Sequence, residues 1–182
     1  MAGAGMKAIK NRIASVNSTK QITNAMHLVA SSKLRKAKQA TENSSAYFNT
    51  MYETIVDISV NTKGLNSQFL KARDLKTRCH LVIAGDRGLA GGYNSSAFKE
   101  AEKYMGLVED YVITVGKKSY DYFSKKDVKI IDRIESVEKY EYEELRAITD
   151  KLMKMYEEGQ IDEVILTYTE FESALSQKPK AI

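Results

Sequence analysis

Four of the ten glycines lie in one short stretch, GDRGLAGG, at residues 85–92. A glycine-rich turn between a strand and a helix can bind phosphates, because the backbone approaches the ligand closely and the helix N-terminus favours anions. Here Tyr93 and Asn94 stand where a Walker sequence needs lysine and a hydroxyl residue, and the glycine spacing does not fit Gly-x-Gly-x-x-Gly. We therefore interpret the stretch as a structural turn that packs a helix closely on a strand. Its residues are Gly85, Asp86, Arg87, Gly88, Gly91 and Gly92.

Other side chains with catalytic or ligand chemistry are sparse. The two histidines, His27 and His80, are far apart in the sequence, and Cys79 is the single cysteine. No nucleophile, base and orienting group are grouped, so we predict no catalytic residue, no cofactor and no metal site. Cys79 lies in an apolar run and is expected to be buried, and one cysteine excludes an internal disulfide.

Charge is distributed unevenly along the chain. Residues 1–40 hold eight lysines and arginines and no acid, whereas the remaining residues hold 20 basic and 24 acidic side chains. A basic segment suits nucleic acid, an anionic membrane or an acidic protein surface. Because no aromatic residue precedes Tyr47 and the chain has no tryptophan, the first two partners are less favoured. No apolar run is long enough to cross a bilayer, so any membrane association is expected to be peripheral.

One long helix is predicted to carry this basic segment. Met6–Ile58 contains no glycine or proline, and alternating steps of three and four residues from Met6 meet an apolar residue at eleven of sixteen positions. A sustained seven-residue apolar repeat predicts a coiled-coil seam that winds left-handed around a partner, on a rod about 80 Å long.

The predicted seam is polar at three successive positions: Lys20, Thr23 and His27. One position away, Ile22, Met26 and Val29 form a second short apolar face. In a purely structural coiled coil this gap would be an irregularity tolerated for register. In a protein that touches different partners along its length, it would be a contact site.

After a predicted linker over residues 61–76, apolar runs alternate with helical patterns. Strands are predicted over Arg78–Ala84, Tyr111–Gly116, Val128–Asp132 and Glu163–Phe171. Helices are predicted over Asn94–Met105, Lys117–Lys125 and Tyr142–Glu158, the first with Asn94 or Ser95 as its N-cap. This alternation is typical of right-handed crossovers in a parallel sheet. We expect an α/β fold: a small open, mostly parallel sheet with helices on both faces, Rossmann-like, over residues 77–182, joined to a very long coiled-coil helix over residues 1–60.

Two stretches of the chain resemble the gamma subunit of the bacterial F-type (rotary) ATP synthase. They are the opening MAGAGMKAIKNRIASVNSTKQITNAMHLVASSKLRKAKQ and, after the first predicted strand, GDRGLAGGYNSS. The final EFESALSQKPKAI also resembles the family's exit from its α/β domain, so the resemblance covers nearly the whole chain.

This resemblance implies a non-catalytic rotor subunit of the central stalk. The long helix would turn inside a ring of alternating alpha and beta subunits, so that proton-driven rotation changes the nucleotide affinity of the catalytic sites. The α/β domain would lie near the epsilon subunit and the membrane c-ring, peripheral to the cytoplasmic face of the cell membrane, without inserting into it or binding nucleic acid. The contact with beta would fall on Ile22, Met26, Val29, Lys33, Arg35 and Lys36.

The sequence departs from the family pattern at its end. Gamma subunits continue into a second long helix that pairs antiparallel with the first, whereas this sequence stops at Ile182. We therefore expect the seam to lack its partner and these residues alone to make a poor rotor. Two alternative hypotheses are a structural α/β module whose basic coiled-coil arm dimerises or binds nucleic acid, and a nucleotide-binding enzyme.

Overall fold

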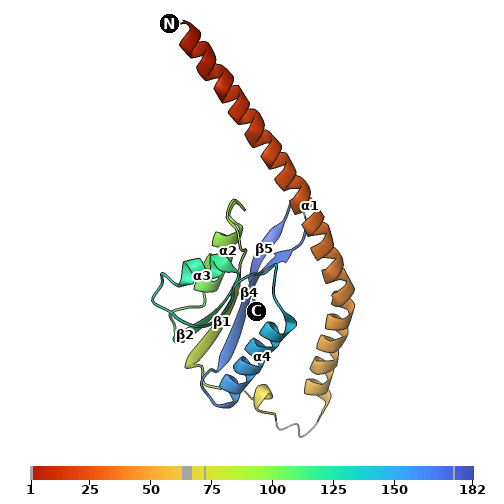
Figure 1. Ribbon diagram of the computed structural model, residues 1–182. Helices are drawn as coiled ribbons and strands as arrows, with labels where there is room; N and C mark the ends of the chain where they lie inside the picture. The colour runs from red at the N-terminus through yellow and green to blue at the C-terminus, as the bar shows by residue number, and fades with distance from the viewer. Residues whose placement is uncertain (1, 63–66, 72, 174) are drawn as a thin grey trace. The chain divides into compact units, whose positions relative to one another are not determined.

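The N-terminal apolar repeat forms one continuous helix, α1, over Ala2–Asn61 (Figure 1). The computed structural model describes residues 2–62, 67–71, 73–173 and 175–182. The chain divides into two units, Met1–Asn66 and Ser67–Ile182, which we call the shaft and the body. Every described side chain of α1 is exposed, including the seam residues Met6 and Ile13. Since most helical stability comes from packing an apolar face, a covering partner for this seam remains a prediction.

The body is built on a five-stranded sheet in the order β3-β2-β1-β4-β5 (Figure 1). Its strands are β1 Thr77–Ile83, β2 Glu109–Val115, β3 Lys129–Ile134, β4 Glu163–Phe171 and β5 Gln177–Ala181. The first four strands run parallel, and β5 runs antiparallel to β4. The helices are α2 Tyr93–Glu102, α3 Lys117–Phe123 and α4 Tyr142–Glu157. The predicted α/β class is therefore confirmed.

Alternate residues of the central strands feed two separate cores, one on each face of the sheet. On one face, Val82 and Val112 pack with Phe98 of α2 and Phe123 of α3. On the other face the buried cluster consists of Cys79, Ile113, Val115, Ile134, Ile148 and Ile161. Ile148 belongs to α4, so this helix covers the face opposite to α2 and α3. Cys79 is buried as predicted, and burial raises the pKa of its thiol to about 12.

The fifth strand was not predicted. β5 contains only one apolar side chain apart from the chain's single proline, Pro179, so it has neither the alternation nor the β-branched residues of a strand signal. Leu166 and Ile182 exchange both backbone hydrogen bonds, at 2.8 and 3.0 Å. Along β5 the residues at odd positions therefore direct their backbone groups away from β4, and Pro179, which lacks an N–H, occupies one of these outward positions.

Part of the predicted linker has regular structure. Gln68–Leu70 form a short 3-10 helix, η1, whose Phe69 N–H donates to the Ser67 hydroxyl at 3.3 Å. Residues 63–66 and 72 of that linker lie outside the described residues.

A buried charged network crosses the amino-terminal end of the sheet. His80 of β1 is fully buried, and its Nε2 lies 2.8 Å from Oδ1 of Asp110, whose Oδ2 accepts the Gly106 N–H at 2.6 Å. Arg78 donates from Nε to Glu163 at 2.6 Å and from Nη1 to the Tyr104 carbonyl. Burial lowers the pKa of His80 below 6.5, although the bond to Asp110 opposes the shift. Burial therefore favours the uncharged imidazole.

We expect this histidine to make the stability of the body depend on pH. The pKa of His80 in the folded protein lies below its value of about 6.5 in the unfolded chain, so the unfolded chain binds the proton first as pH falls. The contribution of His80 to the free energy of unfolding is therefore complete above about pH 6.5. It is lost as pH falls through the pKa of the folded protein. NMR titration of a His27→Gln variant, in which His80 is the only histidine, should give an imidazole midpoint below 6.5. Urea unfolding between pH 7 and 5 should show a smaller loss of stability in His80→Gln. A midpoint at or above 6.5 would contradict the prediction.

Candidate interaction surfaces

Ile22, Met26 and Val29 form an exposed apolar stripe on α1. Their side chains are 59%, 55% and 58% exposed. At about 100° per residue, the i, i+4, i+7 spacing places them within roughly 60° of one another around the helix axis. The seam residues at the same level of α1 are rotated by about 80–160° from Ile22 around the helix axis. α1 therefore presents two distinct surfaces at this level.

Two of the three predicted cationic residues continue this apolar stripe. Lys33 and Lys36 follow Ile22 by 11 and 14 positions, which brings them back to within about 40° of it. Arg35 lies about 140° away and faces a different direction. We call Ile22, Met26, Val29, Lys33 and Lys36 the shaft stripe. The structure thus aligns five of the six predicted contact residues and separates Arg35 from them.

The polar gap in the seam presents fewer polar groups than its composition suggests. The Thr23 hydroxyl donates to the Thr19 carbonyl at 2.9 Å, and Thr19 donates to Ser15 at 3.0 Å. A threonine whose hydroxyl returns to its own helix leaves its methyl group for an external contact. Lys20 and His27 are exposed.

Asp86 joins the glycine-rich turn to two other loops at the carboxyl end of the sheet. Its Oδ2 accepts from the Ser136 hydroxyl at 2.6 Å, and its Oδ1 accepts the N–H groups of Val137 at 3.1 Å and Lys117 at 3.3 Å. Partial burial raises the pKa of Asp86, but these hydrogen bonds outweigh it and the pKa lies below its ordinary value. The charged carboxylate thus fixes the loops that follow β1, β2 and β3.

Asn94 holds the same turn from the other side. Its Oδ1 accepts the Gly85 N–H at 2.8 Å and its Nδ2 donates to the Arg87 carbonyl at 3.2 Å. The expectation that Asn94 or Ser95 caps the helix was wrong: α2 begins at Tyr93 with Gly92 as N-cap, because the Asn94 amide is used by the turn and Ser95 donates back to Gly92. Within the turn Gly91 has φ +56°, and Leu89 adopts φ +60° with its side chain fully exposed. Gly88 and Arg87 are exposed.

Among the glycines that the structure describes, the most constrained one lies outside the predicted turn. Gly116 ends β2 with φ +90°, and a Cβ built on it would lie 2.1 Å from the Ala84 carbonyl oxygen. Its N–H donates to Ile134 at 2.9 Å, so the ends of β1, β2 and β3 converge on this residue. The sequence signal was its position as the last residue of the second predicted strand.

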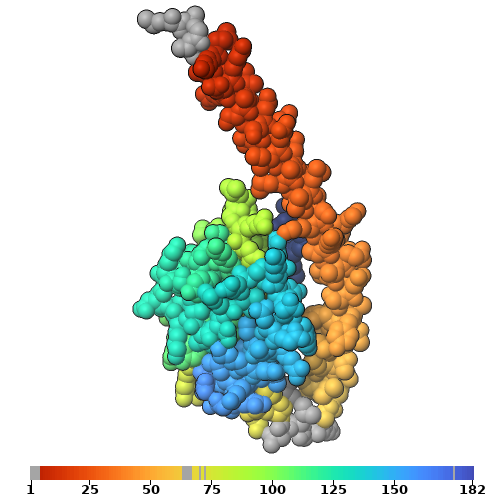
Figure 2. Space-filling view, in the orientation of Figure 1, coloured from red at the N-terminus to blue at the C-terminus, as the bar shows by residue number. Residues whose placement is uncertain are grey.

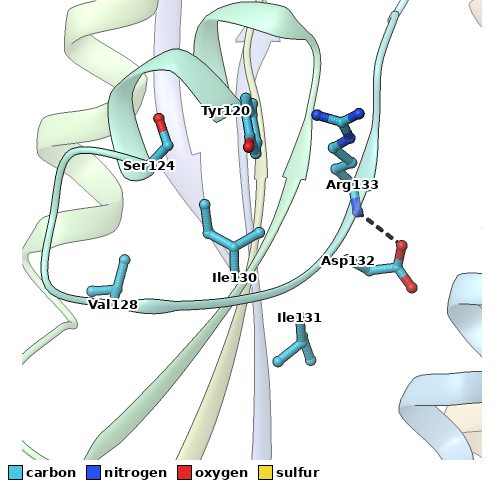
Figure 3. A pocket seen from close by; sticks show the side chains of 7 residues that line it. All are labelled: Tyr120, Ser124, Val128, Ile130, Ile131, Asp132 and Arg133. Carbon is cyan, nitrogen blue, oxygen red and sulfur yellow. Dashed lines mark hydrogen bonds between the residues drawn. The ribbon is translucent and has the colours of Figure 1, made fainter.

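A hollow of about 450 Å³ lies beside β3 (Figure 3). Tyr120 of α3 and Ile130 and Arg133 of β3 contribute to its lining, and the Arg133 guanidinium lies 4.8 Å from the centre of the Tyr120 ring. Asp132 accepts the Arg133 N–H at 2.8 Å and the Lys151 ammonium at 2.7 Å, while the same ammonium donates to the Ile131 carbonyl at 2.7 Å. These polar groups bond to one another, and the lining of the hollow combines polar and apolar surface.

Two kinds of feature are absent from the described part of the chain. Among those residues, His, Cys, Asp and Glu side chains form no group of three that could hold a metal ion. No helix of the same residues combines the length and apolarity needed to span a bilayer.

Comparison with known proteins gives a consistent result. A protein-family model described as ATP synthase matches residues 5–182. The "ATP synthase gamma chain" of Alkaliphilus metalliredigens is 39% identical over 182 residues, which cover 99% of this chain and 63% of the relative. That of Ruminococcus albus is 39% identical over 183 residues, covering 97% and 64%. The chain therefore spans slightly less than two thirds of the length of these relatives.

One relative has a more specific name, and one solved structure supports the fold. The "ATP synthase gamma chain, sodium ion specific" of Acetobacterium woodii is 37% identical over 171 residues, covering 93% of this chain and 57% of the relative. A chain from the central stalk and c-ring of the Tetrahymena thermophila mitochondrial ATP synthase superposes with a TM-score of 0.65 at 21% identity, over 88% of this chain and 70% of that one.

Proposed function

This chain belongs to the gamma-chain family of ATP synthases, and on that premise we propose that it is a rotor subunit of the central stalk. In this proposal α1 turns inside a ring of alternating alpha and beta subunits and couples ion-driven rotation to conformational changes at the catalytic sites of the ring. The family match over residues 5–182, which includes nearly all of α1, is the observation that carries the proposal.

The two surfaces of α1 support contacts with two partners at the same height. The seam suits a second helix wound around α1, whereas the shaft stripe faces elsewhere and suits the ring. We assign the shaft stripe and Arg35 to contacts with beta subunits. Exposed ion pairs contribute only about 0–1 kcal/mol each, which suits a surface that must release one beta subunit and meet the next.

The chain itself has a mechanical role in this proposal, and the catalytic sites belong to the ring. The body lies outside the ring, near the epsilon subunit and the c-ring, at the cytoplasmic face of the membrane. Its carboxyl-end loops, tied together by Asp86, are built as a rigid unit, which suits a part that transmits torque.

Co-purification tests the proposal directly. A tagged full-length protein expressed in its own cells is expected to recover alpha and beta subunits in stoichiometric amounts after a moderate-salt wash. Recovery of nucleic acid with no alpha or beta, together with a salt-dependent DNA gel shift, would instead support the alternative of a basic coiled-coil arm.

A further inference from the structure

The first segment of the body is fastened to the end of α4. This segment, residues 67–76 without Ala72, is called the strap. The Phe69 ring stacks on the Tyr156 ring with centroids 5.3 Å apart and planes 15° apart, and the Arg73 guanidinium carbon lies 3.8 Å from the centre of the same ring. Phe69 and Arg73 therefore both contact the ring of Tyr156.

Three different parts of Tyr156 contact the strap. Besides the ring, its backbone carbonyl accepts a 2.6 Å hydrogen bond from Arg73 Nη1, and its hydroxyl donates to the Gln68 carbonyl at 3.4 Å. Tyr156 lies in the last turn of α4, where the helix dipole is negative, and its carbonyl also accepts the Gly159 N–H at 3.1 Å. A half-buried arginine is therefore well suited to this position.

The strap is also fixed at its other end, and its anchor reaches the core. Oδ2 of Asp162 accepts the N–H groups of Lys76 and Thr77 at 2.9 and 3.0 Å, and these two bonds lower the pKa of Asp162. Tyr156 packs against the buried cluster that contains Ile148 and Ile161. The strap is thus held between the beginning of β1 and the end of α4, and Figure 2 shows its yellow atoms next to blue atoms of the body.

This fastening limits the length of chain that could unroll from the beginning of the body. If it were free, the chain over positions 67–76 could extend by about 33 Å. Held on Tyr156, the strap contributes almost none of that length. We propose that Tyr156 is a positioning residue that anchors the strap to the body, so that motion of α1 is transmitted rather than absorbed by unrolling of the strap. This inference rests on the proposed rotor function.

Hydrogen exchange tests the anchor in the protein alone. In Tyr156→Ala, amides of residues 67–76 are expected to exchange about tenfold faster, whereas amides of β1 and β2 change less than about twofold. Tyr156→Phe keeps the ring and should behave like the wild type. Arg73→Ala acts from the strap side without altering the core and should reproduce the effect. Tyr142→Ala is the matched control, since Tyr142 lies at the other end of α4 and is 70% exposed.

If amide exchange in the strap is unchanged in Tyr156→Ala, or is accelerated equally throughout the body, the proposed anchoring role of Tyr156 is wrong. The transmitting role needs a second readout, the ion transport obtained per ATP hydrolysed in the assembled complex containing the full protein. Tyr156→Ala and Arg73→Ala are expected to lower this ratio at least twofold, and Tyr156→Phe to retain it. If the strap amides exchange faster but the ion transport per ATP hydrolysed is unchanged, the proposed role in transmitting motion is wrong. If the wild-type protein does not assemble, the proposed function and the transmitting role both fail, while the exchange result still decides the anchor.

Discussion

Replacing Gly116 with alanine is expected to destabilise the body by roughly 3 kcal/mol or more. The new Cβ would lie 2.1 Å from the Ala84 carbonyl oxygen, and the residue would be held at φ +90°. The backbone has little freedom to relieve this overlap, because Ala84 and Gly116 both donate 2.9 Å hydrogen bonds within the same strand ends, to Val115 and Ile134. Urea unfolding monitored by circular dichroism would measure the loss, and a strongly affected variant would fail to fold at 37 °C.

Gly159 provides the matched control for this substitution. It has φ +70°, but a Cβ there would meet no atom within 4 Å. Gly159→Ala should therefore cost only the left-handed backbone term, about 1 kcal/mol. Equal losses in the two variants would show that the close approach at Ala84 does not matter.

Reversing the charges of Lys33, Arg35 and Lys36 to glutamate is expected to lower coupled ATP hydrolysis in the assembled complex about tenfold. Each exposed ion pair is worth about 0–1 kcal/mol, so exchanging several attractions for repulsions readily exceeds the ~1.4 kcal/mol that a tenfold change requires. The effect should weaken as salt rises, because exposed charges are screened within about 8–10 Å at physiological ionic strength.

The control for charge reversal changes the same number of charges on the body. Lys99, Lys117 and Lys125 are exposed, and their replacement by glutamate should leave coupled hydrolysis within about twofold of the wild type, the range expected of surface changes. If the two triple variants lose activity equally, net charge rather than the shaft is responsible. If the shaft variant is fully active, the assignment of these residues to beta contacts is wrong.

The sequence predicted those parts of the fold that have a strong apolar period. The repeat from Met6 to Ile58 predicted α1, and the four apolar runs predicted β1 to β4 to within three residues at each end. β5 was missed because it is polar and contains Pro179, and its place in the sheet depends on pairing with β4. Its pairing is a tertiary effect that a local pattern does not contain.

The candidate surfaces, too, were predictable only where they depend on spacing within one element. Spacing along the sequence was enough to align Ile22, Met26 and Val29, because a helix converts spacing into direction. The roles of Asp86 and Tyr156 could not be predicted, since their partners lie about 30 to 90 positions away in the sequence and meet them only in the folded sheet. The sequence placed Gly116 at the end of a predicted strand, but it did not reveal how closely this residue approaches the Ala84 carbonyl oxygen.

Both outer strands of the sheet carry obstacles to the addition of another chain. On β5, Pro179 removes an outward N–H, and on β3 the Arg133 N–H and the Ile131 carbonyl are already occupied by Asp132 and Lys151. A strand from a neighbouring molecule would find these backbone groups missing or taken, so the body resists the edge-to-edge growth that leads to aggregation. Proteins that bind the body are therefore expected to recognise its side chains rather than to extend its sheet. When the protein is made in excess over its partners, its copies are therefore expected to associate through α1 and not through the sheet.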